Sequence, residues 1–252
     1  MLTDERHAEI IRLVNANGAV SVQDLVTYLD ISESTVRRDL LTLDQEGMVK
    51  RVHGGAKSVD SPMYEANLES LQTKYSFHML AKRRIAQYAA GLIQPHDFVY
   101  IDAGSTTEQM AEFLLDSEAT VVTNSLPTAQ KLGRNGVNVY ILPGRVKGKT
   151  EAIVGSEMRR MLTRYHFTKG FFGTNGISLT AGCTTPDDEE AACKQAAVKQ
   201  CQERYILADG SKFGLSSHIT FAKLNDVSIF TTEPPATVDL APYQQVTEVH
   251  IL

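Results

Sequence analysis

The stretch SESTVRRDLLTLDQEGMVKRVHGGAK, residues 32–57, decides the first part of the fold, because it contains the signals for a helix and a hairpin in direct succession. The hydroxyl of Ser32 can accept an amide proton of the first helical turn, which makes this residue a good N-cap. Gly47 can adopt the left-handed conformation that ends a helix. The sequence therefore predicts a helix over residues 33–46.

One face of this predicted helix is apolar. Its buried stripe is expected to consist of Val36, Leu40 and Leu43, with Leu41 beside it. The polar side chains near the N-terminal end lie outside the stripe. A recognition helix presents that end to base edges in the major groove, where arginine can hold guanine through two parallel hydrogen bonds. The residues expected to contact DNA in this way are Ser34, Thr35, Arg37 and Arg38.

The segment after the helix, residues 48–57, carries positive charge and no acidic residue. Gly54 and Gly55 supply a tight turn, so the segment predicts a β-hairpin wing. Cations on such a wing can bind DNA phosphates. The candidate phosphate contacts are Lys50, Arg51, His53 and Lys57.

Two shorter helices are expected before this stretch. Asn17 and Gly18 end the first helix, and Ser21 caps the second. Three helices and a hairpin make a winged helix-turn-helix domain of residues 1–57. A three-helix bundle with merely solvated arginines is the alternative, but the succession of cap, apolar stripe, exposed arginines and acid-free hairpin favours DNA binding. The residues expected to face inward are His7, Ile10, Ile11, Val14, Leu25, Val26 and Leu29.

The composition is that of an ordinary globular protein, with 252 residues, 42% hydrophobic and 22% charged. A net charge of −5 argues against a protein that coats nucleic acid through bulk charge, but not against local, specific DNA binding. Three cysteines without a CxxC pair indicate neither a disulfide framework nor a zinc site, so no metal or cofactor is expected. No apolar run approaches the roughly 18 residues of a membrane span, which leads us to expect a cytoplasmic protein without membrane contact.

Residues 58–76 show no sustained periodicity and predict a linker. From residue 77 to residue 252, beginning with a helix at 77–93, short β runs alternate with amphipathic helices. That alternation predicts an α/β domain with a mainly parallel sheet and helices on both faces. Such a domain binds its ligand at the carboxyl ends of the strands. The expected strands are 98–101, 121–122, 137–142, 170–172, 205–208 and 228–231.

Four loops that follow these strands carry side chains suited to a phosphorylated ligand. In the first, a glycine and three hydroxyls precede a helix expected at 108–115, and amides and hydroxyls in that position suit an anion. The other three loops lie at 123–125, 173–176 and 209–212. They supply asparagine, glycine, aspartate or lysine side chains, and each loop alone could be an ordinary turn. The candidate effector-binding residues are Asp102, Gly104, Ser105, Thr106, Thr107, Asn124, Gly173, Asn175, Asp209 and Lys212.

Further charged residues have no clear role from the sequence. The cationic loop at 144–149 suits a ligand or a solvated turn equally well. The acidic run 187–190 is expected to cap a helix that continues to about Glu203. Lys194 on that helix could point into the ligand site or into solvent.

Essentially the whole chain resembles one protein family. The resemblance to the DeoR family of bacterial transcriptional regulators is carried by STVRRDL at 34–40 and VKRVHGGA at 49–56, and that to the family's sensor domain by DAGSTT at 102–107, TNS at 123–125, GTNGI at 173–177 and DGSKFG at 209–214. It implies a repressor of a sugar-utilisation operon, acting as a homodimer or homotetramer on double-stranded operator DNA. It further implies that a phosphorylated sugar, with a ketose phosphate as one candidate, releases the operator.

The sensor domain in turn resembles ribose-5-phosphate isomerase. Residues 104–107 match the phosphate loop of that enzyme, and residues 209–212 match its Asp-Ala-Ser-Lys turn. Where the enzyme has an acidic Gly-Ala-Asp-Glu loop, this chain reads Gly-Thr-Asn-Gly at 173–176, and proton abstraction needs a positioned base. The resemblance therefore implies binding without catalysis. The alternative, an isomerase-like enzyme with an accessory DNA-binding domain, would have to use Asp102, Glu190 or Lys194.

Overall fold

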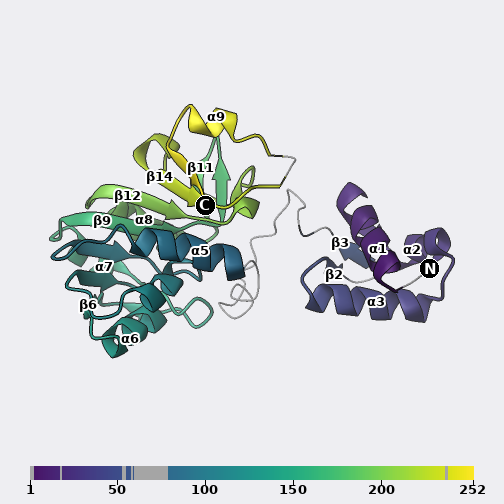
Figure 1. Cartoon of the computed structure of the whole chain (residues 1–252), viewed down its shortest axis with the longest axis horizontal. Helices are drawn as coiled ribbons and strands as arrows, with labels where there is room; N and C mark the ends of the chain where they lie inside the picture. Colours follow the sequence, from purple (N-terminus) through teal and green to yellow (C-terminus); the bar gives the residue numbers. More distant parts are fainter. Residues whose placement is uncertain (1–2, 18, 53–54, 58, 60–78, 236–237) are drawn as a thin grey trace. The chain divides into compact units, whose positions relative to one another are not determined.

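The computed structural model describes residues 3–17, 19–52, 55–57, 59, 79–235 and 238–252. Two compact units make up the chain, Met1–Glu65 and Ala66–Leu252 (Figure 1). Apart from Val59, the linker predicted at 58–76 lies outside the described residues, as does the start of the helix predicted at 77–93.

The N-terminal unit combines helices with a small antiparallel sheet, so the predicted winged helix-turn-helix is confirmed. Its sheet has the strand order β1-β3-β2, and β2 and β3 form the predicted hairpin. Among the described residues, nine buried apolar side chains from Ile10 to Ala56 form a core that joins the helices to the hairpin. In chain order the described elements are α1 (Thr3–Asn17), β1 (Ala19–Ser21), α2 (Val22–Leu29), α3 (Glu33–Gln45), β2 (Lys50–Val52) and β3 (Gly55–Lys57).

Helix α3 begins and ends as its sequence predicts. The hydroxyl of Ser32 accepts a hydrogen bond from the amide of Thr35 at 3.3 Å, and Gly47 has a φ of +71°. The predicted stripe of Val36, Leu40 and Leu43 is fully buried.

The prediction for Leu41 was wrong, because this side chain is 42% exposed. The buried stripe instead includes a polar residue, Asp39, which is only 5% exposed. Arg6 and His7 of α1 contact Asp39, so the helix packs on α1 through an ion pair as well as through apolar contacts.

The C-terminal unit is built on a seven-stranded parallel sheet with the order β15-β14-β12-β9-β4-β5-β6. From β4 the chain builds outward through β5 to β6, and from β9 it builds the other way through β12 to β15. The strand order therefore reverses between β4 and β9, and open α/β sheets bind ligands at such a point. The strands are β4 (Phe98–Ile101), β5 (Thr120–Thr123), β6 (Asn138–Ile141), β9 (Phe167–Gly173), β12 (Cys201–Leu207), β14 (Ser228–Thr231) and β15 (Val249–Ile251).

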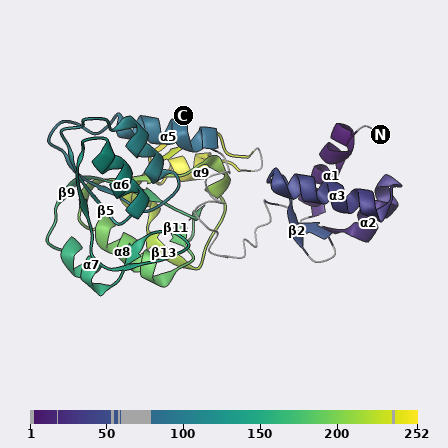
Figure 2. The ribbon, with the colours of Figure 1, turned by 90° about the horizontal axis from the view of Figure 1, so that it is seen from below.

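Helices cover both faces of this sheet, as predicted. Figure 2 shows α5 on one side, and α7 and α8 on the other. Side chains alternate along each strand, so Val99 and Ile101 of β4 pack with α5, whereas Tyr100 packs with α7 and α8. The described α-helices of this unit are α5 (Met79–Ala90), α6 (Leu126–Arg134), α7 (Ser156–Leu162), α8 (Asp188–Val198) and α9 (Ala241–Gln244).

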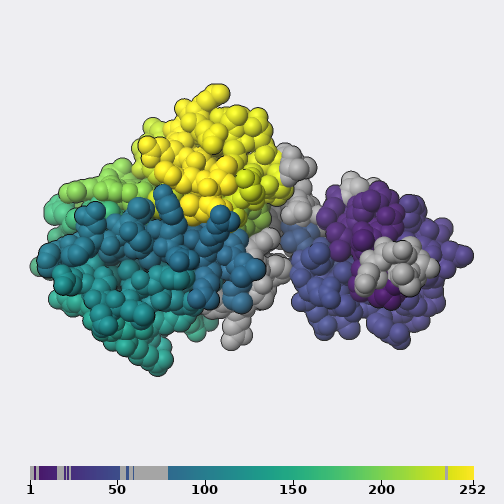
Figure 3. Space-filling view, in the orientation of Figure 1, coloured from purple at the N-terminus to yellow at the C-terminus, as the bar shows by residue number. Residues whose placement is uncertain are grey.

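Helix α5 also packs on β14 and β15, the last two strands of the chain. Figure 3 shows the surface of α5 in contact with the surface of the C-terminal segment. The ring of Tyr88 stands 5.0 Å from that of Phe230 in β14 and 6.3 Å from that of His250 in β15. This contact fixes the helix that follows the predicted linker onto the sheet.

Two predicted helices differ in the structure. The helix expected at 108–115 is a 3-10 helix, η1 (Thr107–Phe113), whose first residue donates its hydroxyl proton to the carbonyls of Asp102 and Gly104 and so draws the turn tight. The helix expected to reach Glu203 ends at Val198, because the chain enters β12 at Cys201, where parallel pairing with β9 overrides helix propensity.

Smaller elements were not predicted from the sequence. An antiparallel sheet, which packs on the face of the main sheet that carries α8, has the order β10-β11-β13, and a two-stranded ribbon joins β7 and β8. None of the helices in the described part of the chain has the length and apolar character that a membrane crossing requires. These elements are β7 (Arg145–Val146), β8 (Ile153–Val154), β10 (Gly176–Ser178), β11 (Gly182–Thr185) and β13 (Ile219–Ala222), together with the 3-10 turns η2 (Gly210–Lys212) and η3 (Leu224–Asp226).

Candidate DNA-binding surface and effector site

The N-terminal end of α3 presents polar side chains. The hydroxyls of Ser34 and Thr35 lie 3.0 and 2.8 Å from the Ser32 hydroxyl, which ties both to the cap. Arg37 and Arg38 are exposed. Each of these four residues was a candidate for contact with bases.

Arg37 is engaged by its own helix. Its Nε and Nη2 atoms donate to the Oε1 atom of Glu33, at 2.8 and 2.6 Å, and both side chains are 54% exposed. A surface ion pair of this kind is worth about 0–1 kcal/mol. DNA can therefore compete for the guanidinium at little cost.

The wing is attached to the recognition helix through a backbone contact. The amide of Arg51 donates to the carboxylate of Asp44 at 2.9 Å, and the side chains of Lys50 and Arg51 are exposed. The backbone of Lys57 in β3 is paired with that of Lys50 in β2. His53 lies outside the described residues.

Asp39 attaches α3 to α1, a role that the sequence did not predict. It accepts bonds from Arg6 at 2.6 and 3.0 Å and lies 3.2 Å from the Nε2 atom of His7. Burial works to raise the pKa of Asp39, but the hydrogen bonds and charges of Arg6 and His7 outweigh it and lower the pKa below its ordinary value. An aspartate at an apolar-stripe position was the available signal.

The candidate effector loops meet at the switch point of the main sheet. Asp102 follows β4 directly, and its Oδ2 atom accepts from the amide of Gly173 at the end of β9, at 3.2 Å. A Cβ atom on Gly104 would lie 3.9 Å from the Cα atom of Gly173. The predicted loops at 102–107 and 173–176 are thus in contact at the place where α/β sheets bind ligands.

Within the first loop, the hydroxyls have different partners. Thr107 donates to the backbone at 2.7 and 3.0 Å and so shapes the loop. Ser105 and Thr106 are nearly buried, and their hydroxyls make no hydrogen bond to the part of the chain that the structure describes. These two hydroxyls therefore have unused capacity for a ligand.

Asn124 holds this loop in place. Its Oδ1 atom accepts from the hydroxyl of Tyr100 at 3.0 Å and from the amide of Ala103 at 2.9 Å. Its Nδ2 atom donates to the carbonyl of Ile153 at 3.1 Å. The amide side chain joins β4, β5 and β8 and is buried.

The remaining two candidate loops are also structured by internal contacts. The backbone amide of Asn175 donates to the carbonyl of Thr184, and the side-chain Oδ1 atom of Asn175 accepts from the Thr185 hydroxyl at 3.3 Å. Asp209 follows β12 and caps η2, where its Oδ1 atom accepts from the amide of Ser211 at 3.1 Å. Lys212 ends η2 and is partly buried.

Helix α8 brings a cation into the site. The Nζ atom of Lys194 donates a hydrogen bond to Oδ2 of Asp102 and another to the carbonyl of Gly173, at 2.9 Å. Of the two orientations that the sequence left open for Lys194, the side chain therefore has the one toward the candidate site and not the one toward solvent. Its place in the apolar stripe between Ala191 and Val198 was a signal for burial.

The cationic loop that precedes β8 is docked on the first turn of α8. Lys147 lies 2.5 Å from Asp187 and 3.4 Å from Glu190, and the hydroxyl of Thr150 donates to Glu190 at 3.0 Å. Asp187 also caps the helix, as predicted, by accepting from the amide of Glu190. No cluster of three His, Cys, Asp or Glu suited to a metal occurs among the described residues.

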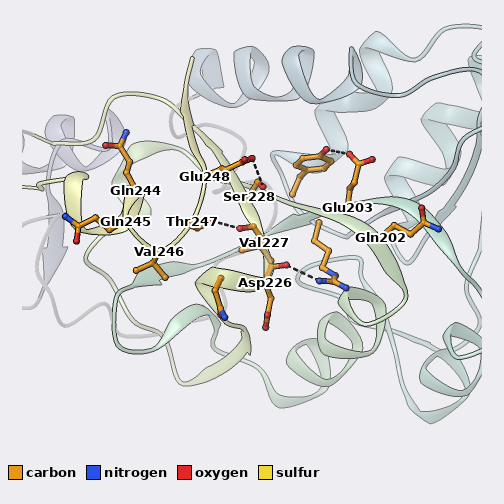
Figure 4. A pocket seen from close by; sticks show the side chains of 13 residues that line it. Gln202, Glu203, Asp226, Val227, Ser228, Gln244, Gln245, Val246, Thr247 and Glu248 are labelled. Carbon is orange, nitrogen blue, oxygen red and sulfur yellow. Dashed lines mark hydrogen bonds between the residues drawn. The ribbon is translucent and has the colours of Figure 1, made fainter.

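An open groove of about 700 Å³ lies at the amino ends of the strands, on the other side of the sheet from the carboxyl ends. It is formed where β12 and β14 begin and by the turn before β15 (Figure 4). Arg204 in its wall donates to the carbonyls of Val198 and Cys201 at 2.9 and 3.0 Å, so its guanidinium serves the fold. None of the candidate effector residues lines this groove.

Both units match known family models. Residues 6–62 match the DeoR-like helix-turn-helix domain, and residues 78–234 match the DeoR C terminal sensor domain. The chain belongs to the DeoR family of transcriptional regulators. This DeoR-family protein is 40% identical to the HTH-type transcriptional regulator FruR of Bacillus subtilis strain 168, over 100% of this chain and 99% of the relative.

Further relatives are repressors by name. The DeoR-family protein is 34% identical to the lactose phosphotransferase system repressor of Staphylococcus epidermidis, over 91% of each chain, and to that of Staphylococcus aureus strain N315, over 89% of each. Among solved structures, ribose 5-phosphate isomerase from Plasmodium falciparum is similar over 53% of this chain and 52% of its own, with 15% identity and a TM-score of 0.39. The sorbitol operon regulator SorC of Klebsiella pneumoniae is similar over 82% and 88%, with 10% identity and a TM-score of 0.36.

Proposed function

We propose that this DeoR-family protein represses a sugar-utilisation operon and that a phosphorylated sugar releases it from the operator. The observation that carries the proposal is the presence, in one chain, of a winged helix-turn-helix with exposed cations and a switch-point site with two unused hydroxyls. The names of its relatives, which include lactose phosphotransferase system repressors, support the same function.

On DNA, the N-terminal end of α3 enters the major groove and the wing lies on the backbone. Arg37 reads a base after leaving Glu33, with Ser34, Thr35 and Arg38 beside it. Lys50, Arg51, His53 and Lys57 hold phosphates. A homodimer or homotetramer presents two such helices to operator half-sites, because helix-turn-helix proteins read paired half-sites through their own symmetry.

In the effector site, the phosphate binds to the loop at 104–107, where Ser105 and Thr106 donate their hydroxyls, and Lys212 adds positive charge. The acceptors for sugar hydroxyls are Asp102, Asn175 and Asp209. Gly104 and Gly173 allow the ligand to approach the backbone closely. Asn124 contributes by holding the loop.

Release of DNA requires that the sugar phosphate binds the DNA-incompetent arrangement better than the competent one. The usual scale for such coupling is about 1–3 kcal/mol, or roughly 5- to 150-fold in affinity. The effector therefore weakens operator binding by that factor, and operator DNA weakens effector binding equally.

We also propose that the site binds its ligand without turnover. The loop at 173–176 has no carboxylate, and the Asp102 carboxylate is held by Lys194 and Gly173. A general base must reach the proton that it removes. Incubation of the protein with fructose 6-phosphate, followed by NMR, should show no isomerisation; a rate proportional to protein concentration would overturn this part of the proposal.

The regulatory function is tested by fluorescence anisotropy. Duplexes that bind tightly are first selected from a randomised pool, and sugar phosphates are then added one at a time at two salt concentrations. We expect one sugar phosphate, and not its dephosphorylated form, to release a salt-sensitive complex. If no duplex is enriched, or if no sugar phosphate changes the affinity, the proposal is wrong.

A further inference from the structure

Asp102 and Lys194 form a buried ion pair at the carboxyl end of the sheet, with exposures of 1% and 5%. Removing two charges from water costs several kcal/mol per ion, and such a pair can often be replaced by apolar residues without loss of stability. A role in stability is therefore a weak explanation for this pair, and its place in the candidate site suggests a role in binding.

The geometry of the pair is one-sided. The Oδ2 atom of Asp102 accepts from both Lys194 and the amide of Gly173, whereas its Oδ1 atom accepts no hydrogen bond from the described residues. Lys194 is fixed from the other side as well, because it donates to the Gly173 carbonyl and stands 5.3 Å from the centroid of the Phe221 ring. The carboxylate is thus held through one oxygen and has the other one spare.

We propose that Lys194 is a positioning residue of the effector site, which keeps Asp102 charged and oriented so that its Oδ1 atom accepts a hydroxyl group of the sugar. This inference rests on the proposed sugar-phosphate site. The ligand class is a sugar phosphate whose hydroxyl lies near the phosphate group, because only Ala103 separates Asp102 from the loop at 104–107 that is proposed to bind phosphate. Lys194 acts through Asp102 and touches no part of the ligand.

The charges around Asp102 explain why the lysine is needed. Burial raises the pKa of Asp102, and Lys194 counteracts this effect through its charge and its hydrogen bond, with help from the amide of Gly173. Without the lysine, only that amide would oppose burial, so the pKa of the Asp102 carboxyl group would rise further. A protonated carboxyl is a weaker acceptor for a hydroxyl. The titratable groups around the pair are Glu190 and Cys193 of α8, Tyr100 of β4 and Cys183 of β11.

The test uses the full-length protein and isothermal titration calorimetry with fructose 1-phosphate, fructose 6-phosphate and inorganic phosphate, between pH 6.5 and pH 8.5. Each variant is compared with the wild type at the same pH, which cancels titration of the phosphate group itself. The variants are Lys194→Met, Asp102→Asn and the double variant. Lys199→Met, at the exposed C-cap of the same helix, is the matched control.

We expect Lys194→Met to weaken binding of a sugar phosphate at least tenfold at pH 6.5 and to regain affinity toward pH 8.5, as Asp102 loses its proton. Its affinity for inorganic phosphate should match that of the wild type. Asp102→Asn should be weak at every pH, and the double variant should bind no more weakly than Asp102→Asn. Lys199→Met should behave as the wild type.

Three results would overturn the inference. They are a Lys194→Met deficit that does not change with pH, a loss of inorganic phosphate binding in that variant, and a double variant that binds more weakly than Asp102→Asn. The last comparison decides the matter even if Lys194→Met does not fold, because the double variant contains no unpaired buried charge. If the wild type binds neither fructose phosphate, the same titrations use the sugar phosphate that releases the operator complex. If no sugar phosphate binds the wild type, the proposed function itself is wrong and the inference falls with it.

Discussion

The guanidinium of Arg37 and the carboxylate of Glu33 lie one helical turn apart on the recognition helix, joined by hydrogen bonds of 2.8 and 2.6 Å. This pair occupies the end of α3 that is proposed to enter the major groove. In the proposed complex, the negative charge of Glu33 would therefore lie near the DNA phosphates and compete with DNA for Arg37.

Glu33→Gln should tighten DNA binding, because it frees Arg37 and removes a charge that repels phosphates. An exposed ion pair is worth up to about 1 kcal/mol, so a two- to fivefold gain in affinity is expected at low salt. Anisotropy titrations measure it, with Glu46→Gln at the far end of the helix as the control. Equal affinities for wild type and Glu33→Gln would show that this end of α3 lies away from DNA.

Arg37→Ala and Lys50→Ala should affect DNA binding differently. The first should cost about 1–3 kcal/mol on selected DNA and little on scrambled DNA, because a base contact discriminates between sequences. The second should weaken both alike and reduce the salt slope by about one, because a phosphate contact releases a counterion. If the two variants act identically on both duplexes, Arg37 does not read bases.

Asp39→Asn should destabilise the protein by about 2–3 kcal/mol, because it leaves Arg6 without its partner in a mostly buried position. The pKa of Asp39 is lowered from its ordinary value of 3.8, so the contribution is complete above about pH 4 and disappears as the pH falls through the lowered pKa. The difference between wild type and variant should be constant from pH 5 to pH 7 and shrink below pH 4.

Urea unfolding of the full-length protein, followed by circular dichroism at each pH, measures this difference. Gln45→Ala, at an exposed position of the same helix, controls for changes in helix propensity. A difference that persists unchanged at pH 3 would mean that the charge of Asp39 contributes nothing.

The N-terminal unit shows how far local signals reach. Ser32, Gly47 and the stripe of Val36 could be predicted because a cap, a left-handed residue and a helical period depend only on neighbours in sequence. The exposure of Leu41 could not, because the width of a buried stripe depends on the helices that pack against it. The burial of Asp39 likewise depends on residues of α1 more than thirty positions earlier.

In the effector site, the loops could be predicted individually but not their arrangement. Asp102 and Gly173 are 71 positions apart, and they meet because β9 lies next to β4, which no local pattern shows. Lys194 enters the site from 92 positions away, and only its place in an apolar stripe indicated burial. Strand order, set by the packing of the whole sheet, supplies this information.

Asn124→Ala should destabilise the protein by about 3 kcal/mol or more, because it leaves three buried backbone and hydroxyl groups, at Tyr100, Ala103 and Ile153, without a partner. Tyr100→Phe removes only one of these hydrogen bonds and should cost about 1 kcal/mol. Urea unfolding of both variants tests this ranking. Because Ala103 directly precedes the proposed phosphate loop at 104–107, Asn124→Ala should also weaken binding of sugar phosphates, whereas Tyr100→Phe should preserve it. Equal costs for the two variants would show that the loop is held by contacts other than those of Asn124.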